Sequence, residues 1–199
     1  MKKPLLNIAC LGLLSSSAFG VVTITSANVV GFQDASGDAL SAGVLALLVV
    51  DGGGDGFSAI NETSTFAIND FFSDGNDEIV NIVESLPPAG FAVNPFIQGV
   101  GTSPLTLNLD SNITTGDEYA VYWFPALTTS STQFTAGDSY GITRGTDWII
   151  PADNTSTVNP SSVTSAGPAN FTVASIPEPS STALLGLGGF AFLARRRRA

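Results

Sequence analysis

The amino-acid sequence predicts an all-β domain of the β-sandwich or jelly-roll type, with at most one short helix. Short apolar or alternating runs recur along the chain, and Gly, Asn, Asp, Ser and Pro separate them. Regular short strands with such separators are typical of sandwich architectures. The predicted strands are Val21–Thr25, Val44–Val50, Thr65–Ile68, Phe91–Asn94, Leu105–Leu109, Glu118–Phe124, Ser139–Thr143, Asp147–Ile150 and Asn170–Ala174.

Three further segments complete the predicted fold. In Glu118–Phe124 large apolar residues occupy both alternating positions, which indicates a central strand covered on both faces. Asn76–Leu86 carries apolar residues at helical spacing and ends at two prolines, so it is the one predicted helix. The segment Asp153–Pro168 is rich in Ser, Thr, Asn and Pro and is predicted to be a long loop, whereas Ile176–Ser181 is predicted to be a linker.

The N-terminal twenty residues have the pattern of a secretory signal peptide. Lys2 and Lys3 form a basic region, Leu5–Leu14 is apolar, and the small residues Ala18 and Gly20 flank the expected cleavage position. The chain therefore divides into a signal peptide at 1–20, an exported body at 21–175 and a C-terminal segment at 176–199.

The C-terminal segment combines a short polar motif, an apolar run and a basic cluster. Pro177, Glu178 and Pro179 precede the apolar residues Thr182 to Ala194, and Arg195-Arg196-Arg197-Arg198 follow. As a helix, the apolar run spans about 20 Å, which is short of the roughly 30 Å of the bilayer core, but flanking arginines can reach the headgroups. The positive-inside rule keeps the arginines cytoplasmic and puts the body outside. The segment is thus predicted to be a transmembrane anchor of the inner membrane.

This three-part tail resembles the PEP-CTERM sorting signal of Gram-negative, exopolysaccharide-making bacteria. The resemblance rests on Pro177–Pro179, Thr182–Ala194 and Arg195–Arg198. It implies that an exosortase, an integral-membrane cysteine transpeptidase, recognises the tail and cuts near Pro177–Pro179. The general secretion machinery would be a second partner. The body would then reach the cell surface or the extracellular matrix.

The composition of the body excludes several function classes. Arg144 is its single basic residue against sixteen acidic ones, a formal charge of −15, and it contains no lysine, histidine or cysteine. Nucleic acid and anionic membrane surfaces are therefore excluded as partners. Catalysis through histidine, cysteine or lysine is excluded as well. The body is predicted not to be an enzyme, although a carboxylate pair of the glycosidase type remains the third alternative.

Calcium is the one cofactor that the sequence suggests. Asp51, Asp55, Gly56 and Glu62 occupy positions 1, 5, 6 and 12 of a twelve-residue segment, as in an EF-hand loop. Gly53 supplies no side-chain oxygen at position 3, so a looser calcium loop and a plain glycine-rich turn both stay open. The acids Asp70, Asp74, Asp77 and Glu78 suit the start of the predicted helix.

The aromatic residues raise a second possibility, a stacking platform for sugars centred on Trp123 or Trp148. The alternative is that these rings belong to the core. Taken together, the sequence predicts a secreted structural or adhesive protein of the envelope or of the polysaccharide matrix of a biofilm. Divalent cations would bridge its acidic surface to other subunits or to anionic exopolysaccharide. The alternative function is that of a carbohydrate-binding module of the cell surface.

Overall fold

The computed structural model describes an all-β domain, which confirms the predicted fold class. It describes residues 20–24, 28–40, 43–72, 75–84, 96–98, 105–151, 157–158, 161, 163 and 165–176, and no helix occurs among them. The strands are β1 (Val21–Ile24), β2 (Asn28–Val30), β3 (Phe32–Gln33), β4 (Leu45–Asp51), β5 (Asp77–Glu84), β6 (Phe96–Gln98), β7 (Leu105–Asn108), β8 (Tyr119–Phe124), β9 (Ser139–Thr143), β10 (Thr157–Val158), β11 (Gly167–Pro168) and β12 (Phe171–Thr172).

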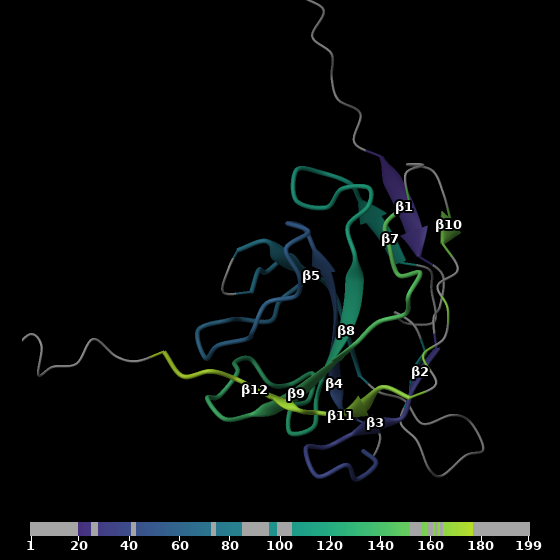
Figure 1. Ribbon diagram of the computed structural model, residues 1–199. Helices are drawn as coiled ribbons and strands as arrows, with labels where there is room; N and C mark the ends of the chain where they lie inside the picture. The colour runs from purple at the N-terminus through teal and green to yellow at the C-terminus, as the bar shows by residue number, and fades with distance from the viewer. Residues whose placement is uncertain are drawn as a thin grey trace, which may run out of the picture.

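A five-stranded antiparallel sheet with the strand order β12-β9-β8-β4-β5 forms the centre of the domain (Figure 1). Strands β4 and β8 lie side by side in its middle, and every residue of both is buried. Leu48 pairs with Val121 on one face of this sheet. Leu47 pairs with Tyr122 on the other. The prediction of a central strand ending at Phe124 is therefore confirmed, because its alternating side chains enter two different cores.

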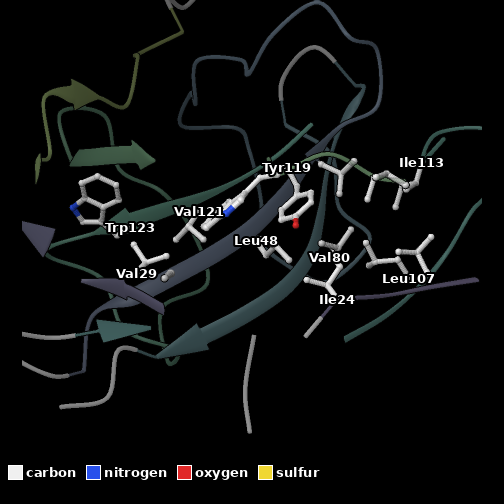
Figure 2. Packing of buried hydrophobic residues seen from close by; sticks show 14 of the residues in the cluster. Ile24, Val29, Leu48, Val80, Leu107, Ile113, Tyr119, Val121 and Trp123 are labelled. Atoms are coloured by element: carbon white, nitrogen blue, oxygen red, sulfur yellow. The ribbon is translucent and has the colours of Figure 1, made fainter. Parts of the chain in front are cut away.

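One face of the central sheet packs against a second layer of short strands. This layer consists of the sheet β10-β1-β7 and the strand pairs β2-β6 and β11-β3. Figure 2 shows Leu48 and Val121 of the central sheet in the same cluster as Ile24 of β1 and Leu107 of β7. The indole of Trp123 meets the Phe32 ring edge-on at a centroid distance of 5.1 Å. This two-layer arrangement is the sandwich part of the fold.

The opposite face of the central sheet is covered by two loops instead of a sheet. The loops 52–72 and 125–138 contribute the buried residues Ile60, Phe66, Phe72 and Phe134. The Phe66 and Phe134 rings lie 4.9 Å apart, and Phe72 meets the ring of Tyr122 at 5.1 Å. Because these loops carry a hydrophobic core, their backbone has to be ordered by local hydrogen bonds.

The predicted helix Asn76–Leu86 is wrong: residues 77–84 form strand β5, paired antiparallel with β4. The pairing shifts register so that Leu48 faces Asn81 and Val49 faces Ile79, which leaves Val80 as an extra residue in a bulge. The bulge restarts the alternation of the strand. Ile79 and Ile82 then enter one core, while Val80 and Val83 enter the other. A bulged strand buried on both faces thus produces the three-residue spacing that imitates a helix.

Two predicted strands are absent as strands. Thr65–Ile68 makes only an isolated bridge from Thr65, and Asp147–Ile150 makes only one from Ile149. In Asn170–Ala174 just Phe171 and Thr172 form β12, and Phe91–Asn94 lies outside the described residues. Strands β2, β3, β6, β10 and β11 were not expected from the pattern. Each is two or three residues long, which is too short for an alternation to be visible.

The start of the body agrees with the predicted strand Val21–Thr25, since β1 begins at Val21. Gly20 precedes it, and its carbonyl accepts a hydrogen bond from Leu109 N–H at 2.8 Å. Residues 1–19, with Ala18 and the rest of the predicted signal peptide, lie outside the described residues.

Candidate functional site

The glycine-rich segment after β4 is a turn built around Asp51. This side chain is 2% exposed, and its carboxylate accepts three backbone N–H groups. The donors are Gly54 at 2.7 Å, Gly56 at 2.9 Å and Gly53 at 3.3 Å. Gly54 and Gly56 have positive φ angles of 65° and 98°, a backbone region that glycine enters without steric cost. The carboxylate therefore satisfies the backbone of the turn, as in an Asx-type turn.

The other two predicted calcium ligands serve different contacts. Asp55 is exposed, and its Oδ1 accepts a hydrogen bond from Asn76 Nδ2 at 3.0 Å. Glu62 Oε1 accepts one from Ile176 N–H at 2.9 Å, at the other end of the body. The described part of the chain contains no group of three carboxylates that could hold a metal ion. The structure thus does not bring Asp51, Asp55 and Glu62 together.

The second acidic cluster also separates into individual roles. Asp70 accepts hydrogen bonds from the Thr65 hydroxyl at 2.6 Å and from Ala67 N–H at 2.9 Å, so it closes a local turn. Asp77 is fully buried and accepts hydrogen bonds from both the N–H and the hydroxyl of Ser58. Asp74 lies outside the described residues. Asp70 and Asp77 therefore order the loops that cover the face of the central sheet opposite β1 and β7. The sequence had suggested instead that these acids begin a helix.

The prediction that Trp123 or Trp148 forms an exposed stacking platform is wrong. Trp123 is 1% and Trp148 2% exposed. The indole N–H of Trp123 donates to the Gln33 carbonyl at 3.2 Å, and that of Trp148 to the Ser161 carbonyl at 2.9 Å. The ring of Trp148 also stacks on Tyr119, with 5.5 Å between centroids. Both tryptophans are thus core residues with satisfied polar atoms.

A pocket of about 560 Å³ between β5 and β7 is a candidate binding site that the sequence did not suggest. Glu78 of β5 lines it and is 6% exposed. Burial raises the pKa of the Glu78 carboxyl, and the nearby charge of Asp110 raises it further. In the sequence, Glu78 stands directly before an apolar run, which could have indicated a buried acid. The predicted helix Asn76–Leu86 instead placed Glu78 in a solvated first turn. The lining residues are Ile68, Asn69, Phe71, Glu78, Val80, Asn81, Leu105, Thr106, Leu107, Asn108, Asp110, Asn112 and Ile113.

The folded body extends to the start of the C-terminal segment. Ala174 N–H donates to the Ile60 carbonyl at 2.9 Å, and Glu62 N–H donates to the Ala174 carbonyl at 3.1 Å. The Ile176 bond to Glu62 is the last of this series. The tail residues Pro177, Glu178, Pro179, Thr182–Ala194 and Arg195–Arg198 lie outside the described residues. Within the described part, no helix is long and apolar enough to cross a membrane.

Comparison with known proteins identifies the tail. No curated protein and no solved structure matches the chain. The family model of the PEP-CTERM protein-sorting motif matches residues 175–198. The match includes Pro177-Glu178-Pro179, the apolar run and the four arginines, and it begins one residue before Ile176, the last residue that the structure describes. The C-terminal segment of this chain is therefore a PEP-CTERM sorting motif, which implies processing by an exosortase.

Proposed function

We propose that this chain is a structural or adhesive protein of the cell envelope or extracellular polysaccharide matrix, delivered by exosortase processing of its tail. The position of the sorting motif carries the proposal. The motif begins at residue 175, and Ile176, the last described residue, still donates a hydrogen bond to Glu62 of the body. The exported part is thus a self-contained β-domain with a processing signal directly at its end.

The chemistry of the body supports a role without catalysis. Its sequence offers no histidine, lysine or cysteine as a nucleophile or base. Several of its carboxylates stabilise turns: Asp34, Asp110, Asp117 and Asp138 each accept backbone N–H groups within three or four residues of themselves. These side chains serve the fold and also contribute negative charge to the loops.

The same charge provides a means of controlled association. A body with a formal charge of −15 repels its copies and repels anionic polysaccharide. Divalent cations would screen and bridge these surfaces, so assembly would depend on the extracellular cation concentration. Bridging of this kind uses carboxylates from two molecules and requires no preformed cluster within one chain.

A processing experiment tests the sorting part. The full chain is expressed in a bacterium that contains an exosortase, and its mass and location are followed with antibodies against the body. Simultaneous replacement of Pro177, Glu178 and Pro179 by alanine is expected to leave the tail attached and the protein in the inner membrane. Asn170→Ala, an exposed position outside the match, is the control and should be processed normally. Equal processing in a host without exosortase would overturn the proposal.

An association experiment tests the structural part. Light scattering of the purified full chain is expected to show larger assemblies in millimolar calcium or magnesium. Sodium chloride of the same ionic strength should have a smaller effect, because monovalent ions screen charge without bridging it. The bridging mechanism is refuted if neither salt, or both salts equally, change the size of the particles.

A further inference from the structure

The pocket between β5 and β7 lies where the two layers of the sandwich meet at their edges. Strand β5 ends the central sheet and β7 ends the three-stranded sheet, so each has a described strand neighbour on one side only. The loop before β5 and the loop after β7 complete the wall. Val80, Leu107 and Ile113, labelled together in Figure 2, are buried and belong to the apolar part of its lining. The volume of about 560 Å³ lies within the range of roughly 300–1,000 Å³ typical of small-molecule sites.

Glu78 gives this pocket its chemical character. The side chain is 6% exposed, and its Oε2 atom is buried without a hydrogen-bond partner in the described part of the chain. Buried polar atoms in folded proteins nearly always have a partner, and an unpaired carboxylate oxygen is among the most costly exceptions. A ligand in the pocket that reaches Glu78 would supply the hydrogen bond that this oxygen lacks.

The second carboxylate of the pocket is held by its own loop. Asp110 Oδ1 accepts the N–H groups of Asn112 at 2.7 Å and of Ile113 at 3.0 Å. Its charge is close enough to raise the pKa of Glu78. No lysine or arginine lines the pocket. Two carboxylates without a cation disfavour every ligand that carries negative charge, including uronic acids and phosphates.

The remaining polar lining consists of neutral groups. Asn69, Asn81, Asn108 and Asn112 bring carboxamide groups, each with donors and an acceptor, and Thr106 brings a hydroxyl. Ile68, which is 54% exposed, adds an apolar surface. A sugar ring carries hydroxyl groups on its rim and C–H groups on its faces. The polar groups and apolar patches of the pocket are complementary to such a ring.

We propose that the pocket between β5 and β7 binds a neutral saccharide, with the Glu78 carboxylate accepting a sugar hydroxyl and the Asn81 carboxamide contributing a second polar contact. This site is distinct from the tryptophans, which are buried elsewhere in the core. The proposal goes beyond the sorting role and does not depend on the tail. Binding is measured on purified protein and sorting in cells, so either can fail while the other stands.

Saturation-transfer difference NMR on the purified full chain tests this proposal. The detergent should contain no sugar, so polyoxyethylene detergents replace maltosides. The probes are glucose, galactose, mannose, N-acetylglucosamine, cellobiose, glucuronate and calcium chloride, and calcium is followed by calorimetry. At least one neutral sugar is expected to receive saturation and to bind more tightly than glucuronate by about tenfold or more.

Three variants locate the binding. Glu78→Gln and Asn81→Ala should each weaken the best sugar, the first by about ten- to a hundredfold, because a charged hydrogen bond is lost. Glu118→Gln is the matched control, since Glu118 is partly exposed and pairs with Arg144 outside the pocket, and it should bind as the original chain does. Cooperative thermal melts establish that each variant is folded. The proposal is overturned if no neutral sugar binds, if Glu78→Gln and Asn81→Ala leave sugar binding unchanged, or if calcium alone is the ligand that requires Glu78.

Discussion

Replacing Asp51 by asparagine separates a structural turn from a calcium loop. In the folded chain the carboxylate accepts N–H groups from Gly53, Gly54 and Gly56. Asparagine keeps one oxygen, but its NH₂ group would face the Gly56 N–H, so that two donors oppose each other. The variant also removes the negative charge that strengthens the two remaining bonds. We therefore expect Asp51→Asn to lower the free energy of unfolding substantially.

The magnitude follows from the bonds that change. A hydrogen bond to a charged group contributes about 1.5–3 kcal/mol, so losing one and weakening two should cost roughly 2–4 kcal/mol. In a domain of this size each kcal/mol moves the melting temperature by about 2–4 °C. Asp51→Asn should thus melt roughly 5–15 °C lower. Asp55→Asn should stay within about 0.5 kcal/mol, because Asp55 is exposed and makes one side-chain hydrogen bond, to Asn76.

Circular dichroism melts of the full chain and both variants, in EDTA and in millimolar calcium, measure these shifts. The turn predicts the same loss for Asp51→Asn in both solutions and almost none for Asp55→Asn. A calcium loop predicts that calcium stabilises the original chain and that both variants abolish this gain. The second pattern would refute the reasoning from the hydrogen bonds.

Three further predictions follow from single contacts. Gly141→Ala would place a methyl group inside the buried indole of Trp123, so urea unfolding should show a loss of about 3 kcal/mol, and a loss below about 1 kcal/mol would contradict this packing. Folding raises the pKa of Glu78, so the free energy of unfolding of the original chain decreases as the pH rises from the ordinary pKa of glutamate to the raised pKa. Glu78→Gln should therefore be more stable than the original chain at neutral pH and nearly as stable as it below the ordinary pKa of glutamate. A difference in stability that is the same at all pH values would contradict the raised pKa. Arg144→Gln breaks an exposed ion pair with Glu118 and should lower the free energy of unfolding by about 1 kcal/mol or less. A larger decrease in urea unfolding would contradict the interpretation of this contact as a surface ion pair.

The sequence predicted those parts of the fold in which local pattern and burial agree. The strand Glu118–Phe124 was predicted as central because large apolar residues fill both alternating positions, and β8 is buried throughout. The strand β5 was missed because a bulge at Val80 shifts the alternation, and the resulting spacing is the same as that of a helix face. A register shift depends on the partner strand, here β4, and one strand's sequence does not contain that information.

The candidate sites show the same limit. Asp51 and Glu62 were grouped because their spacing fits a calcium loop, yet Asp51 turns back on its own glycines while Glu62 contacts the C-terminal end of the body. The exposure of Trp123 and Trp148 depends on which layers cover β8, so residue type alone could not decide it. Glu78 is a candidate because residues of β5 and β7 line one pocket with it, and this arrangement depends on strands that are far apart in the sequence. The sorting tail was predictable because its function is read from the linear sequence.

The positions of the tail and the pocket bear on how the body would be displayed. From Ile176 to the apolar run at Thr182 the chain has five intervening residues, which span at most about 20 Å when extended. The end of the body carrying β12 would thus be held close to the membrane before processing. In Figure 1 strand β12 lies on the side of the domain opposite β1 and β7. In the proposed function, the pocket lined by β7 would then lie on the side away from the membrane, and exosortase processing would take place at the other end. Binding of a neutral saccharide there would allow the body to engage the matrix before the tail is cut.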